Sequence, residues 1–234
     1  MLTASEELGL PPEVVKRTML PRVKLRHMKL HLARLDAADT PGAIVECGVY
    51  RGGSAAALGL FSPKRDLWLY DSFAGLPQPT EKDIGTRSLS APRQGERDVA
   101  KLVRAPGAPL APIGHCAAPW AEVDAFLWEQ LGQGQRFINF VRGWFQDTVA
   151  GEGPDEIAFL HIDGDWYEST KVCLEAFWPR VVPGGTVAVD DYNWWPGCRK
   201  AVDEFFAGLS RETPGQRLLQ SHAAIGTGRY MVKR

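Results

Sequence analysis

The sequence lacks the cysteine spacings that build a zinc site or a disulfide framework. Its four cysteines lie far apart, with no Cys-x-x-Cys pair and no histidine-rich neighbourhood; they are Cys47, Cys116, Cys173 and Cys198. Cysteines spaced in this way are typical of reduced thiols in the cytoplasm. We therefore expect a cytoplasmic protein that depends on neither disulfides nor zinc.

Long apolar runs and a strong charge imbalance are also missing. No apolar run approaches the ~18 residues needed to cross a bilayer, and no basic segment followed by an apolar one occurs at the N-terminus. The net charge is −1, whereas binding of nucleic acid needs clustered positive charge. The one basic stretch, residues 16–34, alternates charges with apolar residues at helical spacing, which predicts a solvated helix face rather than an anion-binding patch. We expect a soluble protein that binds neither membranes nor nucleic acid.

Two nucleotide-binding motifs are absent as well. The sequence contains neither Gly-x-Gly-x-x-Gly nor a Walker-type Gly-Lys-Ser/Thr. The first absence disfavours a nicotinamide or flavin cofactor, and the second disfavours a loop that clamps phosphates.

The sequence does contain a regular alternation of predicted strands and helices. Its 234 residues suffice for one well-packed α/β domain. Residues 1–40 are predicted to form a helical N-terminal extension, and residues 41–234 a single domain. In that domain strand, helix and strand alternate five times, which favours a doubly wound, mainly parallel sheet with helices on both faces. Residues 80–119 are rich in Pro, Gly, Arg and Ala without a sustained period, which is typical of an active-site lid or a passive insertion.

Two of the predicted strands end in carboxylates. Residues 159–162 lead into Asp163 and Asp165, and residues 186–189 lead into Asp190 and Asp191. Because parallel strands deliver their carboxyl ends to one edge of a sheet, these acids are expected to face one another. So many negative charges require a cation between them, and carboxylate oxygens suit magnesium or calcium.

A glycine-rich turn and a further acid belong to the same predicted edge. Residues 48–54 are a glycine-rich turn between the strand 43–47 and a helix of small residues. The strand 67–70 ends at Asp71, about 20 residues later, the spacing at which doubly wound folds place an acid on ribose hydroxyls. A turn and an acid without a phosphate clamp suit an adenosine-bearing cofactor. Next to a hard metal ion, such a pocket predicts metal-assisted group transfer.

These segments together resemble the macrocin O-methyltransferase family, which methylates macrolide sugars. The resemblance rests on Val-Glu-Cys-Gly-Val-Tyr-Arg-Gly-Gly-Ser (45–54), Asp-Ser-Phe-Ala-Gly-Leu-Pro (71–77), Gly-Trp-Phe (143–145), Ile-Asp-Gly-Asp-Trp-Tyr-Glu-Ser-Thr (162–170), Pro-Gly-Gly (183–185), Asp-Asp-Tyr (190–192) and Gly-Cys-Arg-Lys-Ala-Val (197–202). It implies a class I, S-adenosylmethionine-dependent methyltransferase with a Rossmann-like fold. That fold is a mainly parallel seven-stranded sheet with an antiparallel C-terminal edge strand. It also implies a Mg²⁺ site shared with catechol O-methyltransferases.

The resemblance also assigns site residues. Contacts to S-adenosylmethionine are implied for the following residues: Glu46, Gly48, Tyr50, Arg51, Gly52 and Ser54 around its methionine part, Asp71 and Ser72 at the ribose, Trp144, Phe145 and Gln146 at the adenine, and Asp163. The implied Mg²⁺ ligands are Asp163, Asp190 and Asp191.

The general base is a separate question. Catechol-type relatives place a lysine three residues after the first metal aspartate, where this chain has Trp166. Asp165 is a candidate because it lies just beyond the strand, where a nearby cation shapes its pKa. His161 is a second candidate, since strand alternation points it the same way as Asp163. Proton loss to water is a third route.

The expected function is Mg²⁺-dependent methyl transfer to a hydroxyl of a small natural product, such as a sugar on a macrolide or nucleoside antibiotic. One alternative is a nicotinamide-dependent oxidoreductase, and another is a non-catalytic protein that binds an adenosine cofactor. The amphipathic N-terminal helices are expected to pack against a second copy of the chain or over the active site.

Overall fold

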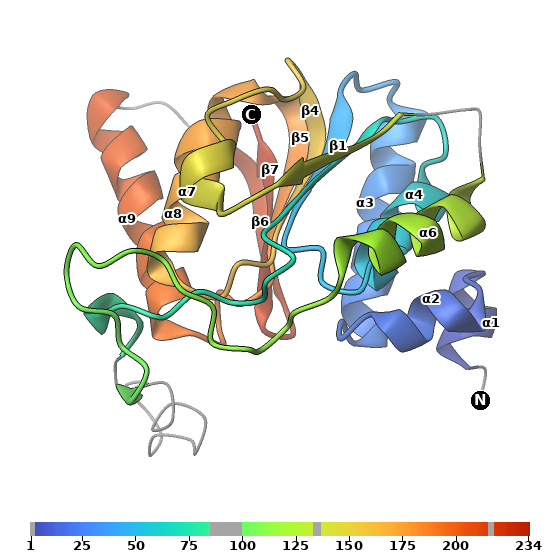
Figure 1. Cartoon of the computed structure of the whole chain (residues 1–234). Helices are drawn as coiled ribbons and strands as arrows, with labels where there is room; N and C mark the ends of the chain where they lie inside the picture. Colours follow the sequence, from blue (N-terminus) through green and yellow to red (C-terminus); the bar gives the residue numbers. More distant parts are fainter. Residues whose placement is uncertain (1–2, 85–99, 133–136, 215–217) are drawn as a thin grey trace.

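The fold is built on one mixed β-sheet. The computed structural model describes residues 3–84, 100–132, 137–214 and 218–234, and within them seven strands pair in the order β3-β2-β1-β4-β5-β7-β6 (Figure 1). The strands are β1 (Ala43–Cys47), β2 (Leu67–Asp71), β3 (Ile138–Arg142), β4 (Ile157–Ile162), β5 (Val181–Val189), β6 (Leu219–Ile225) and β7 (Gly228–Lys233). β1 to β5 pair in parallel, while β7 runs antiparallel to both β5 and β6. The predicted doubly wound sheet with an antiparallel C-terminal edge is confirmed.

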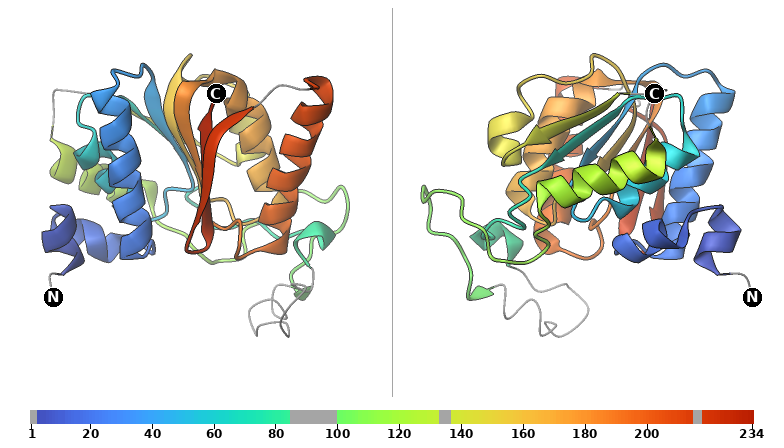
Figure 2. Two further views of the ribbon diagram at one scale, coloured as in Figure 1. Left: turned by 180° about the vertical axis from the view of Figure 1, so that it is seen from behind. Right: turned by 45° about the vertical axis from the view of Figure 1, so that its right-hand side comes forward.

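Helices cover both faces of this sheet (Figures 1 and 2). One face carries α3 (Arg22–Ala37), α4 (Gly53–Phe61) and α6 (Trp120–Leu131), and the other carries α7 (Phe145–Thr148), α8 (Tyr167–Phe177) and α9 (Pro196–Glu212). The short helices are α1 (Ala4–Leu8), α2 (Pro12–Arg17), η1 (Glu81–Asp83) and η2 (Trp178–Arg180). None of the helices in the described ranges has the length and apolarity needed to span a membrane.

The N-terminal helices are part of the core. α2 begins at Pro12 and α3 begins directly after Pro21, where a residue without a backbone N–H is tolerated. α3 lays an apolar stripe on the sheet; its buried members are Leu25, Met28, Leu32 and Leu35. The prediction that the charges of residues 16–34 form a solvated face is wrong for Lys24, which is 3% exposed. The reason is that Lys24 lies on the same stripe of α3 as Met28 and faces the sheet.

The order of the strands creates a switch point between β1 and β4. From this central pair the chain winds outward through β2 and β3 on one side and through β5 on the other. The register pairs Cys47 with Tyr70 and with Ile162, and Ile162 with Val189. The residues that follow these strands therefore meet at one edge, where open α/β sheets bind ligands.

The sequence Pro-Gly-Gly at residues 183–185 predicts a turn, but these residues lie within β5. β5 runs through them without a break, with Gly184 at φ +82° and a shift in the β4/β5 register. A bulge of this kind absorbs extra residues within a strand. The turn prediction is wrong because a bulge and a turn both require a glycine at positive φ.

Residues 80–119, predicted to be a lid or a passive insertion and called the lid segment below, are described at their two ends, 80–84 and 100–119. Residues 85–99 lie outside the described part of the chain. The sequence also predicts strands over residues 136–142 and 217–220, whose first residues, Arg136 and Arg217, lie outside the described part as well. The remainder of the lid segment pairs with the loop after β2: Gln78 N donates to Ala111 O at 2.9 Å, and Ile113 N donates to Leu76 O at 2.9 Å. This places residues 104–116 across the carboxyl edge of the sheet (Figure 1).

Candidate active site

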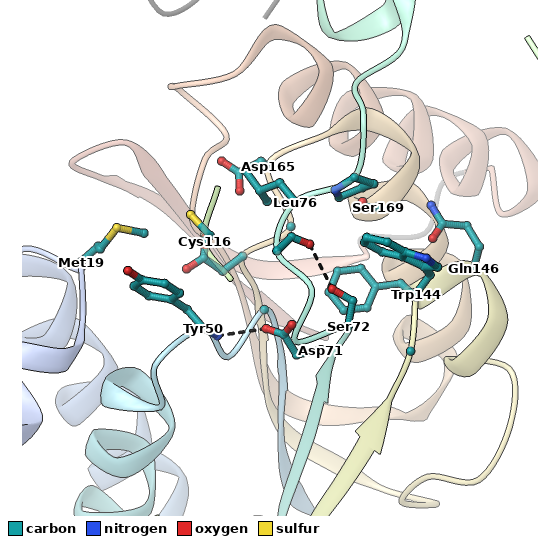
Figure 3. Close-up of a pocket in the computed structure, with 17 residues that line it drawn as sticks. Met19, Tyr50, Asp71, Ser72, Leu76, Cys116, Trp144, Gln146, Asp165 and Ser169 are labelled. Atoms are coloured by element: carbon teal, nitrogen blue, oxygen red, sulfur yellow. Dashed lines mark hydrogen bonds between the residues drawn. The ribbon is translucent and has the colours of Figure 1, made fainter. Parts of the chain in front are cut away.

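A pocket opens at the carboxyl edge, over the switch point between β1 and β4. It is lined by loops that follow β1, β2, β3 and β4, together with one residue before α3 and one from the lid segment. The lining residues are Met19, Gly48, Tyr50, Asp71, Ser72, Gly75, Leu76, Pro77, Cys116, Gly143, Trp144, Phe145, Gln146, Asp163, Gly164, Asp165 and Ser169. Met19, Tyr50 and Cys116 lie on one side of it, and Trp144 and Gln146 on the other (Figure 3).

Gly48 allows the loop after β1 to touch the end of β4. Its φ is +97°, and a Cβ atom at this position would lie 2.0 Å from the carbonyl oxygen of Asp163. Only glycine combines this conformation with such a close approach. The glycine turn thus brings the predicted cofactor loop next to the first predicted metal ligand.

Asp71 organises the pocket floor through backbone hydrogen bonds. Its Oδ2 accepts from Tyr50 N at 3.0 Å (Figure 3) and from Val49 N at 2.7 Å, and its Oδ1 accepts from Phe73 N at 2.6 Å. Tyr50 and Phe73 have φ of +50° and +55°, a region that non-glycine residues adopt only when held there. Burial raises the pKa of Asp71, and the backbone donors partly offset this rise.

Three carboxylates gather beside the pocket. Asp163, Asp165 and Asp191 each offer an oxygen, and these oxygens lie within 4.8 Å of one another. Burial, followed by the charge of Asp190, raises the pKa of Asp163 well above its usual value. Burial, followed by the charge of Asp165, does the same for Asp191. A divalent cation with bonds of about 2.0 to 2.6 Å fits this spacing and would relieve the repulsion.

Asp190 is held by a residue that the sequence analysis did not select. Its Oδ2 lies 2.5 Å from the ammonium of Lys24, which also donates to Asp190 O at 3.2 Å. The three-carboxylate cluster therefore includes Asp163 and Asp191 from the predicted ligand set, with Asp165 in place of Asp190.

Asp165 has an unusual backbone and a defined partner. Its φ is +56°, and its Oδ1 accepts a hydrogen bond from Trp195 Nε1 at 2.6 Å. Burial raises its pKa to about 6, against the lowering effect of the Trp195 bond. The Trp195 ring packs on Trp166 with centroids 5.0 Å apart. Trp195 thus contacts a predicted catalytic group.

His161 and Glu46 are placed away from the pocket. They face each other across β1 and β4, with His161 Nδ1 2.9 Å from Glu46 Oε1 and exposures of 1% and 0%. Glu46, an implied cofactor contact, and His161, a candidate base, are thus not among the residues that line the pocket, and their roles stay predictions. Both side chains lie on the sheet face covered by α3 and α4, each one residue before the end of its strand.

Three further predicted contacts also lie off the pocket. Arg51 is exposed, Gly52 faces Val123 and Phe126 of α6, and Ser54 is buried in the first turn of α4. The remaining predicted cofactor residues line the pocket; they are Gly48, Tyr50, Asp71, Ser72, Trp144, Phe145, Gln146 and Asp163.

Some of the residues that sequence reasoning missed come from outside the recognised motifs. Met19 and Cys116 reach the pocket from segments with no regular pattern. Lys24 had a detectable signal, because it is spaced four residues from Met28 on the apolar stripe of α3.

Comparison with known proteins gives the chain a family. The macrocin-O-methyltransferase (TylF) family matches residues 6–95 and 119–214. One relative is 32% identical over 196 residues, which cover 82% of this chain and 68% of that protein. It is the 8-demethyl-8-(2,3-dimethoxy-alpha-L-rhamnosyl)-tetracenomycin-C 4'-O-methyltransferase of Streptomyces olivaceus. Demethyldecarbamoylnovobiocin O-methyltransferase of Streptomyces niveus is 33% identical over 195 residues, covering 81% and 68%.

A solved structure agrees with this placement. The O-methyltransferase NovP superposes with a TM-score of 0.67 at 29% identity, covering 93% of this chain and 82% of NovP. These matches exclude the alternative function of a nicotinamide-dependent oxidoreductase. The chain belongs to the macrocin O-methyltransferase family and is an S-adenosylmethionine-dependent O-methyltransferase.

Proposed function

We propose that this enzyme is Mg²⁺-dependent and methylates a hydroxyl of a sugar carried on a small natural product. The observation that carries the proposal is the cluster of Asp163, Asp165 and Asp191 at the wall of the cofactor-type pocket. The relatives named above act, by their names, on rhamnosyl-tetracenomycin and on demethyldecarbamoylnovobiocin, which supports a glycosylated acceptor.

S-adenosylmethionine would be held on the side of the pocket that Asp71 organises. Asp71 lines the pocket, and its carboxylate would accept a ribose hydroxyl beside the backbone N–H groups of Val49, Tyr50 and Phe73. Gln146 Nε2 is buried and has no hydrogen-bond partner within the described residues. This donor is available to a ring nitrogen of the adenine. Trp144 and Phe145 supply apolar surface beside it.

Asp163 and Asp191 are the proposed metal ligands on which the sequence and the geometry agree. Mg²⁺ bound there would hold acceptor oxygens and lower the pKa of the reacting hydroxyl. For the third ligand, the sequence pattern favours Asp190 and the geometry favours Asp165. If Asp165 is not a ligand, its Oδ2 serves as the proton acceptor, while Trp195 fixes Oδ1.

The acceptor would enter on the side formed by Met19, Tyr50 and Cys116, opposite Trp144 (Figure 3). This side gathers apolar atoms and one tyrosine hydroxyl, a suitable surface for the aglycone or the sugar ring. Methyl transfer needs little more than an aligned, ionised oxygen, so positioning supplies a large part of the rate.

The test is methyl transfer from labelled S-adenosylmethionine to a panel of glycosylated natural products, with EDTA and with added Mg²⁺. Activity that is abolished by EDTA and restored by Mg²⁺ is expected. Activity that persists in EDTA would refute the metal assignment, and transfer only to acceptors without sugars would refute the substrate class.

Three variants then assign the carboxylates, with S-adenosylhomocysteine binding as the control for the fold. Asp163→Asn is expected to lose both Mg²⁺ binding and turnover. Between Asp165→Asn and Asp190→Asn, the variant with weakened Mg²⁺ binding identifies the third ligand. If Asp165→Asn instead lowers kcat at unchanged Mg²⁺ affinity, Asp165 is the base.

A further inference from the structure

Lys24 brings a buried positive charge to the carboxylate edge. Its side chain is 4% exposed, and its Nζ contacts both Oδ2 and the backbone oxygen of Asp190. The backbone oxygen of Lys24 accepts a hydrogen bond from the Tyr230 hydroxyl at 3.2 Å, which fixes the first turn of α3 against β7. The ammonium is therefore placed by the fold from a position 166 residues away from its partner.

The charge of Lys24 acts beyond Asp190. Asp190 N donates to Ile162 O at 2.9 Å, which holds Asp190 beside Asp163, and Asp191 follows directly in the chain; one oxygen each of Asp163, Asp165 and Asp191 lie within 4.8 Å of one another. Lys24 thus offsets part of the repulsion among the four acids. Burying a carboxylate without a counter-charge is costly, so this ammonium stabilises the cluster when no metal ion is bound.

A metal ion and the ammonium of Lys24 would both interact with the same group of carboxylates. If Mg²⁺ is held by Asp163, Asp165 and Asp191, the ammonium remains nearby as a like charge. If Asp190 is a ligand instead, the cation must share that carboxylate with Nζ. In both arrangements the two positive charges repel at short range in a partly desolvated site, where such forces are strong.

We propose that Lys24 is a built-in counter-ion of the carboxylate cluster that stabilises the metal-free protein and weakens its affinity for Mg²⁺. The inference rests on the Mg²⁺ site of the proposed function. Lys24 is a positioning residue in this scheme, because it acts through Asp190 and not on the substrate. It would let the enzyme fold without metal and keep the bound ion exchangeable.

The test measures Mg²⁺ binding by calorimetry and melting temperature with and without Mg²⁺, on the full chain. Lys24→Met is expected to melt lower than wild type without metal, to bind Mg²⁺ about tenfold more tightly or better, and to gain more in melting temperature when Mg²⁺ is added. Lys24→Arg keeps the charge and should bind Mg²⁺ within a few-fold of wild type. Lys29→Met is the matched control, because Lys29 lies on the same helix and donates to Leu8 O.

The outcomes separate this inference from the proposed function. If wild type binds no Mg²⁺, the metal site itself fails. If wild type binds Mg²⁺ and Lys24→Met binds it equally or more weakly, the counter-ion role is overturned, since Lys24 then only supports the ligand geometry. The same conclusion follows if Lys24→Arg behaves like Lys24→Met, or if Lys24→Met stays unfolded in saturating Mg²⁺ while Lys24→Arg folds.

Discussion

Replacing Asp71 by alanine tests the organisation of the cofactor pocket. The substitution removes the acceptor of three backbone N–H groups, those of Val49, Tyr50 and Phe73. A buried donor left without a partner costs about 1 to 3 kcal/mol. Removing the carboxylate also removes its own burial penalty, so we expect a net loss of about 3 kcal/mol in the free energy of unfolding. For a chain of this length that corresponds to a melting temperature lower by about 6 to 12 °C.

The same change is expected to weaken cofactor binding. Tyr50 and Phe73 would no longer be held at positive φ, and one ribose contact would be lost. We expect the Kd of S-adenosylhomocysteine to rise by about 10- to 100-fold, while kcat at saturating S-adenosylmethionine stays within a few-fold. Asp71→Asn should lie between the two proteins, since its amide oxygen can still serve Val49 and Tyr50 while its NH₂ faces Phe73 N.

Urea unfolding followed by tryptophan fluorescence, together with calorimetry with S-adenosylhomocysteine, measures both effects. Asp66→Ala is the control at the opposite end of β2, where the carboxylate accepts, among the described residues, a 3.2 Å bond from the exposed Phe137 N. It should cost less than about 1 kcal/mol and leave binding unchanged. If Asp71→Ala matches Asp66→Ala in both assays, the role given to Asp71 is refuted.

Three other changes give sharp readouts. Gly48→Ala would place a Cβ 2.0 Å from Asp163 O, so we expect loss of soluble protein or of both S-adenosylhomocysteine and Mg²⁺ binding; a normally active variant would contradict the described turn. Burial, followed by the charge of Arg34, lowers the pKa of His31 to about 4. The free energy of unfolding that depends on neutral His31 is therefore fully present above pH 6.5 and is lost as the pH falls toward 4, by about 1 kcal/mol after allowing for solvent screening. In His31→Gln the urea midpoint should fall less over this range. An equal fall in the variant and in wild type would show that protonation of His31 is not the cause. Burial raises the pKa of Cys116 to about 11, so iodoacetamide should label it slowly at pH 8, faster at pH 10, and more slowly when S-adenosylhomocysteine fills the pocket; rapid labelling at pH 8 would refute the assigned environment.

The sheet and the acid-bearing edge could be predicted because they follow from local rules. An apolar strand that stops at an acid, as at Asp71 and Asp163, delivers that acid to the carboxyl edge whatever the rest of the chain does. The glycine turn at Gly48 likewise needs only its own backbone conformation. Such features are determined by a few consecutive residues.

The failures concern partners that lie far apart in the sequence. Strand alternation showed that His161 and Asp163 point the same way, but not that Glu46, 115 residues away, fills the space beside His161. The ion pair of Lys24 with Asp190 needed α3 to be placed on the sheet before it could be seen. The type of a side chain and the sequence around it therefore did not reveal which distant side chain would form its hydrogen bond or ion pair.

The contacts that hold the two ends of the lid segment have a consequence for enzyme engineering. At one end, buried Asp83 accepts a hydrogen bond from Tyr167 N at 2.6 Å, and a Cβ atom on Gly197 would lie 1.9 Å from Asp83 Oδ1. Asp83 therefore packs directly against the first turns of α8 and α9. At the other end, Arg104 N donates to Pro79 O at 2.8 Å. The family match leaves out residues 96–118, which overlap the C-terminal part of this segment. Chain exchanged between Asp83 and Arg104 would thus enter and leave through fixed points, so its replacement should leave Asp71 and the carboxylates in place.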